Sequence, residues 1–116
     1  MATVYGIKSC DTCRKAMKWL ELAGVEATFH DVRRDGVPAA LDTWVQQLGA
    51  AELVNRRSTT WRQLDEDQRQ RAASEPAALL REQPTLIRRP VLDTGDQVLV
   101  GFREADYRAA LGVEQP

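Results

Sequence analysis

The sequence YGIKSCDTCRKA, residues 5–16, contains both cysteines of a chain of 116 residues. Residues 3–7, which overlap the start of this stretch, form a short apolar segment whose β-forming residues predict a strand. After the turn, apolar residues recur at helical spacing from Cys13 onward until Gly24 supplies a stop. The stretch therefore predicts a strand that passes through a turn into a helix, with Cys10 at the start of that helix.

The rest of the chain extends this pattern to a complete fold. Residues 26–32 predict a second strand, which makes the first three elements a βαβ unit. The other expected elements are an amphipathic helix at 38–48, two or three short helices between Trp61 and Gln83 interrupted by Pro76 and ended by Pro84, a hairpin of residues 90–93 and 97–102, and a helix at 103–111. The order β-α-β, helical insert, β-β-α predicts a thioredoxin-like α/β fold with a four-stranded mixed sheet.

Composition limits the partners that this chain can attract. Its 16 Lys and Arg residues balance 17 Asp and Glu residues, so a formal charge of −1 gives no overall field toward nucleic acid or anionic membranes. No stretch reaches the roughly 18 apolar residues of a membrane span, and the first residues lack the pattern of a signal peptide. We expect one cytoplasmic domain, residues 1–116, with a helical insertion at about 38–83.

Cys10 and Cys13 have the spacing of a redox-active pair. A helix N-terminus favours an anion, so the pKa of the Cys10 thiol should be lowered, although Asp11 acts against this. The nearby cations that add to the effect are Lys8, Arg14 and Lys15. Cys13 lies one turn further along the helix and should be more buried and less acidic. The expected chemistry is attack by Cys10 and resolution by Cys13 through a disulfide.

Other interpretations of the cysteines remain open from the residues alone. Both could be ordinary small residues, with Cys13 on the core face of the helix. A structural zinc ion needs four ligands, and His30, expected as a packed side chain on the second strand, is the only histidine that could join the thiolates. A copper-chaperone-like site is disfavoured because the helical insert is foreign to that small fold. Packing roles are expected for Trp19, Trp44, Trp61, Phe29 and Phe102.

The opening stretch resembles the motif of the arsenate reductase-like (ArsC/Spx) family, and above all its small bacterial YffB-type branch of thiol reductases. Later stretches resemble the same branch in the same order, and the similarity extends from about Val4 to Leu111. These stretches are LVNRRSTTWRQLDE, IRRPVL and LVGFREADY. The resemblance implies a thiol-dependent oxidoreductase without a bound cofactor or metal, which uses glutathione as co-substrate.

The same resemblance implies a set of arginines that bind an anion beside Cys10. Forked guanidinium groups bind two oxygens of an oxyanion or carboxylate at once, which lysine cannot do. The matching positions are Arg14 in the C-x-x-x-R motif, Arg57 with Arg56 as its neighbour, Arg89, and Arg103 after a gap of one residue. Pro90, after Arg89, corresponds to the cis-proline of thioredoxin-like sites.

Two positions depart from the arsenate reductases of this family. Gly6 stands where those enzymes have a histidine four residues before the nucleophile. Cys13 adds a second cysteine, which is typical of the Spx redox-sensing regulators. We therefore expect a reductase that acts on a small thiol or oxyanion substrate other than arsenate. The alternative is an Spx-like regulator that binds RNA polymerase. In either case we expect no direct contact with nucleic acid or a membrane.

Overall fold

Segments from the two ends of the chain build the sheet that carries the cysteine pair. The computed structural model describes residues 2–113. These residues form two compact units, the first made of residues 2–35 and 89–113 and the second of residues 36–88. The second unit contains the predicted insertion at 38–83 and extends a few residues beyond it at both ends.

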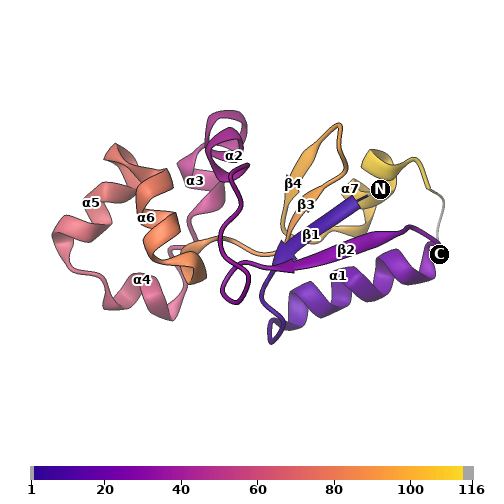
Figure 1. The fold of residues 1–116 in the computed structure, drawn as a ribbon, viewed down its shortest axis with the longest axis horizontal. Helices are drawn as coiled ribbons and strands as arrows, with labels where there is room; N and C mark the ends of the chain where they lie inside the picture. Colours follow the sequence, from indigo (N-terminus) through magenta and orange to yellow (C-terminus); the bar gives the residue numbers. More distant parts are fainter. Residues whose placement is uncertain (1, 114–116) are drawn as a thin grey trace. The chain divides into compact units, whose positions relative to one another are not determined.

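The first unit is an α/β structure with a four-stranded mixed sheet, as predicted (Figure 1). Its elements are β1 (Ala2–Gly6), α1 (Asp11–Leu22), β2 (Ala27–Asp31), β3 (Val91–Asp93), β4 (Val98–Val100) and α7 (Glu104–Leu111). The strand order is β2-β1-β3-β4, with β1 parallel to β2 and β3 antiparallel to both β1 and β4. The thioredoxin-like order is therefore confirmed, and the central strand β1 leads directly into the cysteine segment.

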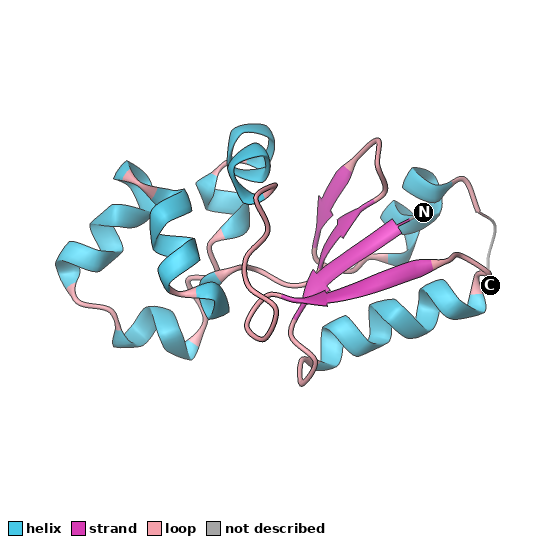
Figure 2. Ribbon diagram, in the orientation of Figure 1, coloured by secondary structure: helices cyan, strands magenta, loops and turns pink. Residues whose placement is uncertain are grey.

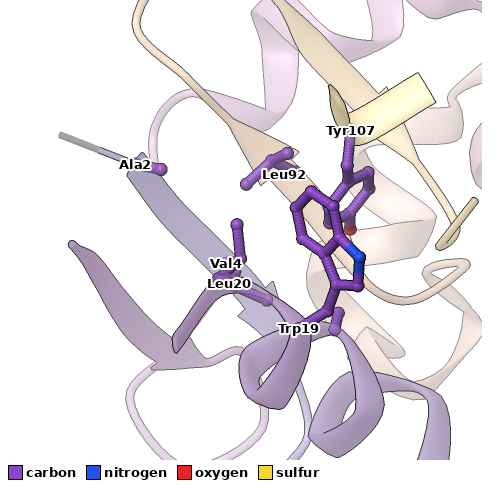
Figure 3. Packing of buried hydrophobic residues seen from close by; sticks show 7 residues of the cluster. Ala2, Val4, Trp19, Leu20, Leu92 and Tyr107 are labelled. Atoms are coloured by element: carbon purple, nitrogen blue, oxygen red, sulfur yellow. The ribbon is translucent and has the colours of Figure 1, made fainter. Parts of the chain in front are cut away.

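One face of this sheet forms the core of the first unit. Side chains alternate along β1, so that Ala2 and Val4 are buried on the same face while Thr3 between them is only half-buried. Trp19 and Leu20 of α1 pack there, and Tyr107 reaches the same cluster from α7 (Figure 3). Both helices consequently cover the same face of the sheet.

The second unit is helical (Figure 2). Its elements are α2 (Leu41–Leu48), α3 (Ala50–Leu53), α4 (Thr59–Gln63), α5 (Glu66–Ser74), α6 (Pro76–Glu82) and the 3-10 helix η1 (Pro84–Leu86). Proline is tolerated in the first turn of a helix because the N–H it lacks has no partner there anyway. Pro76 thus interrupts the helical region as predicted and begins α6, whereas Pro84, which was expected to end the region, begins the 3-10 helix η1.

Two further details of the second unit differ from the sequence-based prediction. The helix expected from Pro38 begins at Leu41, because residues 38–40 form a turn in which the Leu41 N–H donates to the Pro38 carbonyl at 3.1 Å. The short helix α3 was not predicted, since four residues are too few to show a helical period. Within residues 2–113, no helix has both the length and the apolar character needed to cross a membrane.

Candidate functional site

Cys10 is the N-cap residue of α1. After β1 ends, the chain turns so that the Cys10 N–H donates to the Ile7 carbonyl at 2.9 Å. The Cys10 carbonyl then accepts the first helical hydrogen bond, from the Arg14 N–H, at 3.1 Å. The backbone at Cys10 is extended, with φ −81° and ψ 122°, as is usual at this position. The half-buried thiol therefore lies at the positive end of a 12-residue helix.

The surroundings of Cys10 favour its thiolate. Partial burial raises the pKa of the Cys10 thiol, but hydrogen bonds from four groups lower it by more, so the net direction is downward. These groups are the Cys13 N–H, the Cys13 thiol, the Arg89 side chain and the Thr12 N–H. A lowered pKa gives more of the nucleophilic form of a cysteine near neutral pH.

Cys13 has the opposite character. Its side chain is fully buried, and burial raises the pKa of the Cys13 thiol to about 12. This value also includes the hydrogen bond to Cys10 and the negative charge of Cys10, which add to the rise, and the Ile7 N–H and the Arg89 charge, which oppose it. Neither cysteine is in a disulfide. The pair thus combines a Cys10 thiol of lowered pKa with a Cys13 thiol of raised pKa, and the predicted difference in burial and acidity is confirmed.

Arg89 is the arginine that the structure places beside Cys10. It is half-buried, and its side chain forms a hydrogen bond that stabilises the Cys10 thiolate. The peptide bond between Arg89 and Pro90 is cis, as predicted. The Pro90 carbonyl accepts the Gly101 N–H at 2.8 Å, which ties this segment to the end of the hairpin. Arg88, the neighbouring arginine, is exposed.

Replacing Arg89 with leucine should raise the pKa of Cys10 by about 1, because an opposite charge in hydrogen-bonding contact is removed. Thiolate absorbance measured against pH reports this value directly. Arg88→Leu is the matched control, since it removes an exposed charge one position away and should leave the titration of Cys10 where it is. Equal shifts in both variants would mean that general charge, rather than contact, stabilises the thiolate.

Arg14 and Arg103 lie on the surface of the first unit. The Arg14 guanidinium pairs with the Asp11 carboxylate one turn earlier on α1, and the Arg14 side chain is 64% exposed. Arg103 is the exposed N-cap residue of α7, and its carbonyl accepts the Tyr107 N–H at 3.0 Å. Their roles in anion binding stay predictions.

Arg56 and Arg57 have different contacts in the structure, a difference that the sequence could not show. The Arg56 guanidinium lies over the Trp61 ring, 5.3 Å from its centroid, and Arg69 lies over the same ring at 5.6 Å. Arg57 is exposed, and its backbone N–H donates to Asn55 Oδ1 at 3.0 Å. Arg56 therefore has a packing role within the second unit, while anion binding by Arg57 stays a prediction.

Asp31 is a residue of this region that the sequence analysis missed. Asp31 is only 7% exposed, and its carboxylate accepts backbone N–H groups from Lys8 at 2.9 Å, Arg33 at 2.9 Å and Arg34 at 2.8 Å. Burial raises the pKa of Asp31, but these N–H groups lower it by more. Because Lys8 lies in the turn before Cys10, the carboxylate anchors the cysteine segment to the end of β2. The only signal in the sequence was an Asp at the end of a predicted strand.

Asp31→Ala should lower the free energy of unfolding by about 1–3 kcal/mol, since buried N–H groups lose their acceptor. The pKa of Asp31 lies below its unfolded value, so its stabilising effect is fully present above about pH 4 and is lost as the pH falls through the folded-state pKa. Urea denaturation at neutral and acidic pH measures both. Asp35→Ala is the control, because the exposed Asp35 carboxylate accepts only a long 3.3 Å bond from the Asp31 N–H. If the free energy of unfolding falls no more than in this control, Asp31 does not anchor the cysteine segment.

His30, the one histidine of the sequence, lies on β2. His30 is half-buried on β2, and its ring lies 5.1 Å from the Tyr5 ring, which fits the predicted packing role. Among residues 2–113, no three side chains of His, Cys, Asp or Glu are grouped so that they could hold a metal ion.

Sequence relatives cover nearly the whole chain. A model of the ArsC family matches residues 5–110. A protein of Haemophilus influenzae described as uncharacterized is 46% identical over 112 residues, which make up 95% of this chain and 98% of that protein. The global transcriptional regulator Spx of Streptococcus mutans is 30% identical over 116 residues, with 96% of this chain and 83% of that protein covered.

Solved structures match over the same extent. The structure of the YFFB protein has 40% sequence identity and a TM-score of 0.89, with 96% of this chain and 99% of that chain covered. A protein of Brucella melitensis, described as related to arsenate reductase (ArsC), has 41% identity and a TM-score of 0.72, with coverage of 95% and 93%. These relatives share the fold and most of the chain length with the protein.

Proposed function

Because this chain belongs to the ArsC family, we propose that it is a thiol-dependent reductase with the Cys10 thiolate as its nucleophile. The observation that carries the proposal is the set of donors on Cys10, which lower the pKa of a thiol at a helix N-terminus. A half-buried thiolate with an arginine beside it has the properties of an attacking group in thiol–disulfide exchange.

The first step of the proposed reaction is attack on a mixed disulfide between a substrate thiol and glutathione. The Cys10 thiolate bonds to the glutathione sulfur, the disulfide bond of the substrate breaks, and the substrate leaves as a thiolate that takes a proton from water. Arg89 supplies positive charge beside the reacting sulfur, which suits an anionic substrate such as a glutathione adduct.

Cys13 completes the reaction in this proposal. Its thiol is a weak nucleophile while Cys10 is ionised, because the Cys10 charge is one cause of its raised pKa. Once Cys10 is bound to glutathione, that charge disappears and the Cys13 proton is lost more readily. Cys13 then bonds to the Cys10 sulfur, and glutathione leaves with the proton. Two further glutathione molecules reduce the disulfide and are oxidised to glutathione disulfide.

The substrate that we propose is a small thiol adduct or an oxyanion other than arsenate. Gly6 lacks the histidine of the arsenate reductases that the sequence resembles, and it has no side chain that could take that role. We propose Arg57 as a further anion-binding residue, together with Arg14 and Arg103. Glutathione as the electron donor fits the cytoplasm, which we propose as the location.

Steady-state turnover tests this proposal. The reduced protein is assayed with glutathione and a panel of glutathione mixed disulfides of small thiols and peptides, with glutathione reductase and NADPH as the readout. Turnover above the uncatalysed rate is expected with at least one adduct, and Arg57→Ala should raise its KM. No turnover with any member of the panel would exclude the proposed reductase activity.

A second candidate is a redox-sensing regulator of the Spx kind. It is favoured by the relative at 30% identity that carries that name, together with the two closely spaced cysteines. Binding to RNA polymerase, measured with the reduced and the oxidised protein, tests this candidate. No binding in either redox state would exclude it.

A further inference from the structure

The backbone conformation at position 6 does not require a glycine. All seven glycines lie among the described residues, and six of them have a positive φ with no atom within 4 Å of an added Cβ. These six are Gly24, Gly36, Gly49, Gly95, Gly101 and Gly112. Gly6, at the end of β1, has no positive φ, so any residue could adopt its conformation. The reason for a glycine must therefore be space.

The space beside Gly6 is taken by the thiol of Cys13. A Cβ added to Gly6 would lie less than 3.0 Å from Cys13 Sγ, closer than real Cβ atoms come to other atoms. It would also lie 3.3 Å from Cys13 Cβ and 3.4 Å from Phe29 Cε1. Even the smallest side chain at position 6 and the thiol in its present place exclude each other.

That place is also the one from which the Cys13 thiol hydrogen-bonds to Cys10. We propose that Gly6 is a positioning residue, which leaves room for the Cys13 thiol and so holds it against Cys10. The inference rests on the proposed function in one respect, that Cys10 is the nucleophile. It adds that position 6, on the strand and outside the C-x-x-C motif, sets the reactivity of the pair.

The Cys13 thiol can move to another position, so Gly6→Ala can still fold. Side chains in a helix readily use only two of the three χ1 positions, and the thiol would have to leave the one that faces Gly6. Cys13 also borders an open pocket of about 640 Å³ between α1 and β2, lined in part by Met17 and Phe29. Rotation toward this pocket would relieve the clash and break the contact with Cys10.

A double-mutant cycle tests the inference. Thiolate absorbance against pH gives the pKa of Cys10 in the wild type, Gly6→Ala, Cys13→Ala and the double variant. Gly6→Ala should raise this pKa by about 1, a tenfold loss of thiolate at pH values below it, because the Cys13 thiol no longer donates to Cys10. Cys13→Ala should raise it by a similar amount. The double variant should match Cys13→Ala, since the same hydrogen bond cannot be lost twice.

Every outcome decides the question. If Gly6→Ala fails to fold while the double variant folds, the clash with the Cys13 thiol is shown in another way. The inference is overturned if Gly6→Ala does not raise the pKa of Cys10, if it raises it equally when residue 13 is alanine, or if neither Gly6 variant folds. Because turnover is not the readout, a cycle that behaves as expected in a protein without reductase activity would refute the proposed function alone.

Discussion

Replacing Cys10 with serine should lower reductase turnover on the order of 10³-fold or more, because the only proposed nucleophile is removed. A serine hydroxyl is not ionised near neutral pH, so the donors that stabilise the Cys10 thiolate have no anion to act on. Initial rates with the best mixed disulfide of the panel measure this loss, and circular dichroism checks that the variant is folded.

Cys13→Ser is the matched control for this experiment. It keeps the nucleophile and removes the buried second thiol, so that a glutathione molecule from solution must resolve the intermediate. Turnover should fall by much less than in Cys10→Ser and should depend more steeply on glutathione concentration. Equal losses of turnover in the two variants would mean that the cysteines act only as a pair. Full activity in Cys10→Ser would mean that Cys10 is not the nucleophile.

Tyr107→Ala should lower the free energy of unfolding by about 3–5 kcal/mol, which is the usual cost of removing a large buried aromatic side chain. Tyr107 is 1% exposed and packs edge-to-face on Trp19 and Phe102, with ring centroids 5.9 Å and 4.9 Å away. These contacts join α7 to the helix that carries both cysteines. Chemical denaturation followed by tryptophan fluorescence measures the change.

Tyr107→Phe separates packing from hydrogen bonding in this cluster. The Tyr107 hydroxyl donates to the Gly101 carbonyl at 3.0 Å, and its removal should cost only about 1 kcal/mol. If the alanine variant is no less stable than the phenylalanine variant, the aromatic contacts do not hold α7 against α1.

Local patterns were enough to predict the framework of the site. Strand β1, helix α1 and strand β2 lie within a residue or two of their predicted bounds, because alternating and helical apolar patterns and Gly24 mark them clearly. The position of Cys10 at the helix N-terminus followed from the same patterns. The cis bond before Pro90 followed from the resemblance to thioredoxin-like proteins, and the structure confirms it.

Contacts between distant residues could not be predicted in this way. The Asp31 carboxylate and the Lys8 N–H are 23 positions apart, and only the parallel pairing of β1 with β2 brings them together. The same holds for the contact of Cys13 with Gly6, which depends on how α1 packs against β1. In the sequence, Gly6 was notable only for the histidine it lacks.

Trapping the intermediate would show directly whether the Cys10 thiolate attacks a glutathione mixed disulfide. Reduced Cys13→Ser protein is mixed with one equivalent of a glutathionylated peptide, quenched in acid and analysed by mass spectrometry with peptide mapping. We expect glutathione bound to Cys10 and an equal amount of free peptide, with no such adduct in Cys10→Ser. Unmodified Cys10 in the presence of intact peptide disulfide would contradict it.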